Sequence, residues 1–227
     1  KPFVSFEGGS NDVMLDLYFV ELDGTQNSLY NEIFFFPDVN TDKHEGPASF
    51  SPDGREMYYT KTVAGQRLDK GDAVVEHTLQ VFYSFIVGDT VWSDPISALP
   101  FNSLEYSVMH PAISPDGRKI FFASDMPGGY GGTDIYVAYK KEDGEWTKAY
   151  NLGPEVNTFG FELYPFYDGK GHLYFSSNGL PGMGRLDIFK SSFDSLYGWS
   201  HIDNMKVPVN SIGDDICYVD DGSGERG

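Results

Sequence analysis

The fold is decided by residues 111–158, which read PAISPDGRKIFFASDMPGGYGGTDIYVAYKKEDGEWTKAYNLGPEVNT. This stretch contains four short apolar runs, and each run is closed by a turn signal. In Ser114 to Gly117, proline sets φ near about −65° and the following Asp-Gly tolerates positive φ, so a tight turn joins two strands. Glu142-Asp143-Gly144 predicts a second turn of the same kind. The stretch therefore predicts one unit of four antiparallel strands.

The rest of the chain repeats this unit. Tryptophans stand at Trp92, Trp146 and Trp199, with spacings of 54 and 53 residues. An Asn-Thr or Asn-Ser pair closes each unit, beginning at Asn40, Asn102, Asn157 and Asn210. Recurrence at such a period is typical of repeat architectures. The repeats span approximately residues 1–41, 42–103, 104–158 and 159–211, and 212–227 supply one more first strand.

The composition predicts an all-β fold. With 26 Gly, 13 Pro and 16% aromatic residues, the chain is typical of short strands separated by turns, and no window holds a helical period. Four-stranded units arranged radially bury one another's faces, so we expect a single-domain β-propeller over residues 1–227. Residues 2–6 align with a second strand and residues 215–219 with a first strand. The chain is therefore either a four-bladed ring closed by its two ends or part of a five- or six-bladed ring.

Two further structural expectations concern irregular segments. The second unit carries a longer charged stretch from Thr62 to Thr78, which we expect to be a mobile or partner-facing loop. Cys217 lies in an apolar run, and we expect it to be an inert residue of a buried strand. Because it is the only cysteine, an internal disulfide and a cysteine-based metal site are excluded.

Charge and hydropathy limit the classes of partner. A net charge of −18 repels phosphate backbones and anionic lipid headgroups, so no nucleic-acid binding is expected. No segment approaches the roughly 20 apolar residues that span a bilayer, so we expect no membrane insertion by this domain. The opening Lys1-Pro2-Phe3 does not begin a signal peptide, which indicates a trimmed chain or a part of a longer one.

Acidic residues recur near the start of each predicted innermost strand. Glu45, Glu162 and Asp215 follow the closing asparagine by five residues, and Glu105 follows Asn102 by three. In a propeller this places one carboxylate per blade near one mouth of the axial channel. The acids can accept backbone N–H groups of their own loops, bind a hard cation such as Ca²⁺ or Mg²⁺, or dock a basic peptide. We favour the first of these, and predict neither a resident metal ion nor a cofactor.

The glycine-rich loops at residues 125–134 and 178–187 are not followed by a helix, so they lack the amide cluster that binds phosphate. We expect Asp134 and Asp187 to accept hydrogen bonds inside these loops as structural anchors.

No catalytic constellation is present in the sequence. The five histidines show no ligand spacing and no nucleophile elbow occurs, so we predict no catalytic residue and no enzymatic activity. His44 and His110 stand near the start of innermost strands and could join the acids at the channel mouth. Tyr130, Phe159 and Phe161 either form a sugar or peptide platform or pack between blades, and the sequence leaves both alternatives open.

The motifs of the central unit resemble a known repeat. The run Ser114 to Asp125, followed by Asp134-Ile135-Tyr136, Trp146, Asn151-Leu152-Gly153 and Asn157-Thr158, is similar to the WD40-like, TolB-like PD40 propeller repeat. In particular it resembles the variant found in periplasmic lipoproteins of the OmpA family in Gram-negative bacteria.

The resemblance implies a periplasmic domain associated with the outer membrane. Its implied partners are other periplasmic or outer-membrane proteins of a type IX-like secretion assembly, with peptidoglycan contacted only through a domain absent from these residues. We therefore expect a non-catalytic scaffold for protein–protein interaction. The alternatives are a propeller glycoside hydrolase, in which two or three of the four acids act as acid and base, and a carbohydrate- or peptidoglycan-contacting module.

Overall fold

The structure is a computed structural model that describes residues 17–22, 29–34, 39–40, 43–69, 72–88, 91–97 and 99–220. These residues form strands and turns without an α-helix, as the composition predicts. The strands are β1 (Tyr18–Leu22), β2 (Leu29–Phe34), β3 (Glu45–Phe50), β4 (Glu56–Asp69), β5 (Asp72–Val87), β6 (Val91–Trp92), β7 (Val108–Ile113), β8 (Lys119–Ser124), β9 (Asp134–Tyr139), β10 (Tyr150–Asn151), β11 (Glu162–Tyr167), β12 (His172–Ser177), β13 (Asp187–Asp194) and β14 (Gly198–Asn204).

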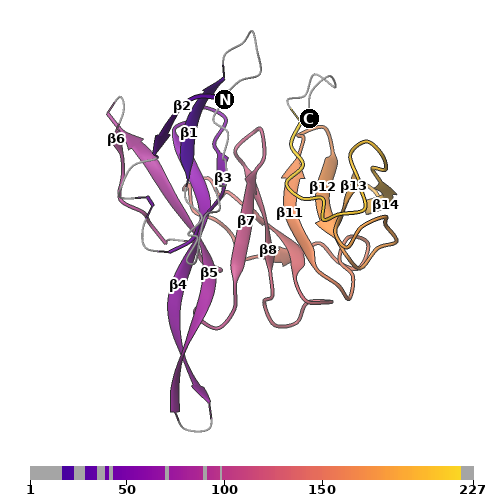
Figure 1. Cartoon of the computed structure of the whole chain (residues 1–227), viewed down its shortest axis with the longest axis horizontal. Helices are drawn as coiled ribbons and strands as arrows, with labels where there is room; N and C mark the ends of the chain where they lie inside the picture. The colour runs from indigo at the N-terminus through magenta and orange to yellow at the C-terminus, as the bar shows by residue number, and fades with distance from the viewer. Residues whose placement is uncertain are drawn as a thin grey trace.

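Each predicted unit is a separate antiparallel sheet. Strands β3 to β6, β7 to β10 and β11 to β14 form three four-stranded sheets in which sequence neighbours pair, and β1 pairs with β2. The sheets stand side by side in chain order (Figure 1), and the first strands of successive sheets, β3, β7 and β11, contact one another. The expected class, an all-β propeller of four-stranded antiparallel blades, is confirmed. Among the described strands, β1 and β2 make no contact with β11 to β14, so this part of the chain forms an open arc.

The first strand of each complete sheet carries a bulge at a proline. The strand register shifts between Glu45 and Ala48, between Met109 and Ala112, and between Leu163 and Phe166. Pro47, Pro111 and Pro165 occupy these interruptions. Proline has no N–H to donate, so it is tolerated where the ladder is broken.

Apolar side chains fill the spaces between adjacent sheets. Leu17 and Val39 of the first unit pack with Met57 and Tyr59 of the second. The next interface joins the second and third units, where the rings of Phe101 and Phe122 stack with centroids 4.4 Å apart. The interface between the third and fourth units is likewise filled by buried apolar and aromatic side chains from both units, including Phe121, Leu173, Phe175 and Phe189. Burial between sheets, and not within one sheet, therefore supplies the core.

The segment Thr62 to Thr78 is a β-hairpin, and the expectation of a loop is wrong. Strands β4 and β5 pair without a register shift from Glu56 and Phe85 to Asp69 and Asp72. The hairpin extends well beyond every other element in Figure 1. The charges in this segment indicated a loop, whereas its β-branched residues, such as Val63 and Thr78, favour strands.

The last described residues depart from the predicted strand at 215–219. Residues 215–220 form no ladder, and one parallel bridge joins Leu186 to Asp214. Tyr218 instead stacks on Tyr174 with ring centroids 4.6 Å apart. Cys217 is exposed in this irregular segment, so its expected place in a buried strand is also wrong. Pairing with residues 2–6, which would close the ring, lies outside the described residues.

Candidate functional site

The two ends of each sheet differ in their connections. We call the end at which β3, β7 and β11 begin the loop end, because the closing asparagines and the glycine-rich loops lie there. The Ser-Pro-Asp-Gly turns form the opposite end, which we call the turn end. Strand β4 starts at the turn end, and its residue Lys61 pairs with Glu45, the first residue of β3. Strand β4 then continues beyond the start of β3. The hairpin therefore projects from the loop end.

The side-chain amide of the closing asparagine in each unit forms two hydrogen bonds with the backbone of one residue in that unit. We call this pair of hydrogen bonds the asparagine clasp. Asn157 accepts a hydrogen bond from the Ile135 N–H at 2.7 Å and donates to the Ile135 carbonyl at 3.0 Å. The other three asparagines make the same two bonds, Asn40 to Leu17, Asn102 to Val81 and Asn210 to Ile188. The clasp fastens the loop end of every unit to its own sheet.

Glu162 is fully buried at the start of β11, and its carboxylate accepts hydrogen bonds from Thr158, which closes the third unit, and from Ser177 of its own unit. It accepts bonds from the Thr158 N–H at 2.8 Å, the Thr158 hydroxyl at 2.7 Å and the Ser177 hydroxyl at 2.7 Å. Burial raises the pKa of Glu162 above its ordinary value, and the hydrogen bonds from Thr158 and Ser177 offset part of that rise.

Of the other three predicted acids, Asp215 repeats the hydrogen bonds that Glu162 makes with the residue four positions earlier, whereas Glu105 does not. Glu45 is fully buried with the Lys61 ammonium 3.6 Å from its carboxylate, and Asp215 accepts the Ser211 N–H at 2.7 Å. Glu105 is exposed, and Val108 starts β7 at the position where Glu162 starts β11. The structure thus brings all four acids to the loop end without gathering them. Within the described ranges, no group of three His, Cys, Asp or Glu side chains could hold a metal ion.

Asp134 and Asp187 hold the glycine-rich loops from inside. The Asp134 carboxylate accepts the Tyr130 N–H at 2.6 Å and the Gly131 N–H at 3.2 Å, and Asp187 accepts from two backbone N–H groups of its own loop. Asn151 donates to Asp134 at 2.7 Å. These contacts fix the loops immediately before strands β9 and β13.

His110 lies in the innermost layer and not at the channel mouth. Its ring stacks on the Tyr164 ring with centroids 3.8 Å apart, and its backbone N–H donates to the Thr60 hydroxyl at 2.9 Å. Burial lowers the pKa of His110 to about 3, so the imidazole is neutral at physiological pH. His44 is exposed just before β3. The structure therefore places these two histidines in unlike surroundings.

Large apolar side chains are exposed at the loop end. Tyr130, Phe159 and Phe161, which the sequence singles out, are all exposed. Leu104 and Ile212 are exposed as well, and they hold the same position as Phe159, directly after the Asn-Thr or Asn-Ser pair. Sequence reasoning missed these two aliphatic residues because it considered aromatic residues only. A large apolar residue recurs directly after the closing Asn-Thr or Asn-Ser pair, and this recurrence is the sequence signal that would have identified them.

A cleft of about 330 Å³ lies at the turn end, between the second and third units. It contains the Lys140 ammonium, which is 3.1 Å from the Glu56 carboxylate and 5.7 Å from the centre of the Trp146 ring. The carboxylates of Asp53 and Asp116 line it, and hydrogen bonds from Ser51 and Ser114 lower the pKa of these two groups. The charged groups of the cleft thus already have partners.

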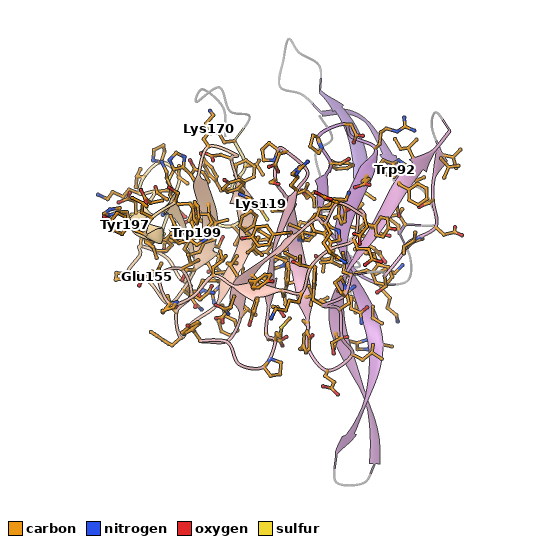
Figure 2. The ribbon with its side chains drawn as sticks, turned by 180° about the vertical axis from the view of Figure 1, so that it is seen from behind. Trp92, Lys119, Glu155, Lys170, Tyr197 and Trp199 are labelled. Atoms are coloured by element: carbon orange, nitrogen blue, oxygen red, sulfur yellow. The ribbon has the colours of Figure 1, made fainter. Side chains whose placement is uncertain are left out.

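The tryptophans that mark the repeat belong to the outer edge of the sheets. Trp92 lies on β6 and Trp199 on β14, the last strand of its sheet in each case, and Figure 2 shows them at opposite sides of the molecule. Trp146 forms an isolated antiparallel β-bridge with Lys140, the residue directly after β9. These rings pack against neighbouring aromatic side chains, for example Trp199 against Phe121.

Comparisons with known proteins give no family assignment. No family model and no curated protein matches the chain. Among solved structures, TolB from Acinetobacter baumannii is similar at 15% identity over 85% of this chain and 38% of its own, with a TM-score of 0.44.

Two other solved structures have a comparable likeness. A structure described in an analysis of two prolyl endopeptidases covers 84% of this chain and 34% of its own at 15% identity, with a TM-score of 0.36. A hypothetical selenium-binding protein from Sulfolobus tokodaii covers 86% and 46% at 12% identity, with a TM-score of 0.38. The chain spans less than half the length of each of these proteins. The fold assignment accordingly rests on the sheets themselves.

Proposed function

We propose that this domain is a non-catalytic scaffold that binds other proteins through its loop end. The observation that carries the proposal is the hairpin of β4 and β5. The Thr62 N–H still donates to the His44 carbonyl at 3.0 Å, but among the described strands residues 63–69 of β4 pair only with β5, and residues 72–78 of β5 pair only with β4. A two-stranded ribbon alone is marginally stable in water, and its unpaired edges accept a further strand. A partner that pairs with this ribbon would complete it.

The setting that we propose is the periplasm, in association with the outer membrane, in an assembly of the type IX secretion kind. Its support is the PD40-like sequence of the central unit, which within that family is similar to the type IX component PorE. No helix of the described residues is long and apolar enough to cross a membrane.

The geometry of the acids favours a scaffold over a glycoside hydrolase. A hydrolase needs two carboxyl groups that face a shared pocket with different protonation states. Glu162 and Glu45 are instead fully buried, and each has a hydrogen-bonding or charged partner within its own unit. A carbohydrate module has no specific observation in its favour beyond exposed rings.

The proposal is tested by shortening the hairpin. Val63 pairs with Thr78, so residues 64–77 can be replaced by Asn-Gly, a two-residue turn that keeps the strand register. We expect the intact domain to capture periplasmic or outer-membrane proteins from the parent envelope, and the shortened domain to lose them. Leu196→Ser, which changes an exposed side chain in the turn between β13 and β14, is the control and should retain capture. The proposal is contradicted if the intact domain and the shortened domain capture the same proteins, or if neither of them captures any protein.

A further inference from the structure

The loop end carries large exposed apolar side chains in successive units. Leu104, Phe159 and Ile212 follow the closing pairs of three successive units and are 55%, 83% and 88% exposed. Other large side chains of the same loops accompany them. We call the whole set the apolar stripe, and its members are Leu104, Tyr130, Phe159, Phe161, Met183 and Ile212.

The loops that carry the stripe abut directly. A Cβ atom at Gly131 would collide with the carbonyl oxygens of Thr158 and Gly160, and one at Gly184 would collide with the Gly213 carbonyl. The absence of side chains at Gly131 and Gly184 therefore lets backbone meet backbone between neighbouring loops. The surface under the stripe is continuous from the third unit to the last described segment.

Packing inside the domain involves one member of the stripe, Phe161, whose ring lies against Gly132 of the preceding unit. No member of the stripe belongs to the buried core of any of the three clusters between sheets. An isolated exposed apolar residue is ordinary, but exposed apolar residues that recur at one end of successive units mark an interaction site. Burying one such side chain in an interface removes apolar surface from water, which stabilises the complex. A partner that covers the stripe would therefore gain free energy from several units at once.

Carboxylates border the stripe. Glu105 follows Leu104, Asp125 opens the loop that holds Tyr130, and Asp214 follows Ile212 after one residue. Glu105, Asp125 and Asp214 are all exposed, and Arg185 is the cation that pairs with Asp214. The net charge of the chain is −18. An apolar surface with an anionic border fits a partner that is both apolar and basic.

We propose that the apolar stripe binds a basic amphipathic helix of a partner protein. Helical spacing gathers large apolar side chains on one face and places Lys and Arg along both flanks of that face, within reach of bordering carboxylates. An alternating strand would instead turn its basic residues away from the surface. The inference rests on the proposed scaffold function and specifies the chemistry of its partner.

The test uses a defined probe, a labelled 14-residue peptide of Leu and Lys at helical spacing, titrated with the domain and followed by fluorescence anisotropy. We expect Phe159→Ser, and the double variant Leu104→Ser with Ile212→Ser, to weaken binding by about tenfold or more, the loss expected for one well-buried apolar side chain. The matched control is Leu196→Ser, because Leu196 is also 83% exposed but lies outside the stripe. This control should bind as the unmodified domain does. Thermal melts verify that each variant is folded.

Three results would overturn the inference. They are unchanged binding by both stripe variants, an equal loss in Leu196→Ser, and equal binding of a peptide in which every Lys is replaced by Glu. The capture experiment on the parent envelope distinguishes failure of the helix-binding inference from failure of the scaffold proposal. If Phe159→Ser retains every partner that the shortened hairpin loses, the scaffold stands and the stripe does not take part in it.

Discussion

The amide of Asn157 holds both backbone groups of Ile135, and three other asparagines repeat this clasp in their own units. The acidic residues at nearby positions repeat only in part, because Glu162 and Asp215 each accept the backbone N–H and the hydroxyl of the residue four positions earlier. Glu162 is buried among hydroxyl groups, while Glu105 is exposed. The clasp needs only the backbone of the same unit, whereas burial of an acid requires a suitable neighbour on the second strand. A residue type that recurs in sequence can therefore have a constant role or a variable one.

His110 gives a pH dependence at the scale of one residue. Its folded-state pKa of about 3 lies below the ordinary value near 6.5, so below pH 6.5 the unfolded chain binds a proton that the folded chain excludes. Stability is fully present above pH 6.5 and is lost as the pH falls toward 3. We expect the unmodified domain to lose about 2 kcal/mol more than His110→Asn between pH 7 and pH 5, as measured by urea unfolding.

The substitution and its control are matched in backbone conformation. His110 has φ of 56°, which asparagine tolerates, and His201 has φ of 53° but an exposed side chain. His201→Asn should leave the pH dependence of the unfolding free energy unchanged. Parallel stability curves for the unmodified domain and His110→Asn would contradict the assignment of a neutral buried imidazole.

At the scale of elements, the connection between the second and third strands varies most between units. In the third and fourth units it is a glycine-rich loop anchored by Asp134 or Asp187, and in the second it is the long hairpin of β4 and β5. The sheets themselves keep the same order and pairing. Variation is thus concentrated at the loop end, where both proposals place the partner.

Gly131 tests how closely the loops must approach each other. In Gly131→Ala the new methyl group would meet the backbone of Thr158 and Gly160, which cannot rotate away as a side chain can. We expect a loss of about 1–3 kcal/mol in the free energy of unfolding, measured in urea. Gly213→Ala is the control, because the nearest atom to its Cβ is the Ser211 hydroxyl oxygen at 3.4 Å. Equal, small losses in the two variants would show that the loops separate freely.

At the scale of the whole molecule, stability comes from the stacking of successive sheets. Each of the three apolar clusters joins two neighbouring units, and the described strands form an arc without contact between its first and last sheets. The net charge of −18 adds self-repulsion, which bound cations would relieve. A specific cation site would therefore raise the melting temperature of the entire domain.

We expect no such specific stabilisation by calcium. Lys61 lies beside Glu45, and three hydrogen bonds satisfy Glu162, so these carboxylates have no vacancy that a cation would need. Millimolar Ca²⁺ should change the melting temperature by less than about 1 °C relative to Na⁺ at equal ionic strength, and EDTA should have no effect. A rise of several degrees with Ca²⁺ that EDTA reverses would establish a cation site at the loop end.

The sequence by itself determined the all-β class, the repeated unit and the position of its turns. These features depend on local patterns, such as Ser-Pro-Asp-Gly at Ser114 and the spacing of the closing asparagines, which act within one unit. The sequence did not determine that Thr62 to Thr78 is a hairpin, because charged side chains occur both in loops and on exposed ribbons.

Only the tertiary structure decided which polar groups are buried and which apolar groups are exposed. Burial lowers the pKa of His110, whose ring stacks on Tyr164, 54 residues away, and Glu162 is fully buried with a hydrogen bond from Ser177 on the next strand. Leu104 and Ile212 are apolar by sequence, yet packing leaves them in solvent. Burial is set by neighbours distant in the chain, so a local pattern can specify the unit but not the surface that the assembled units present.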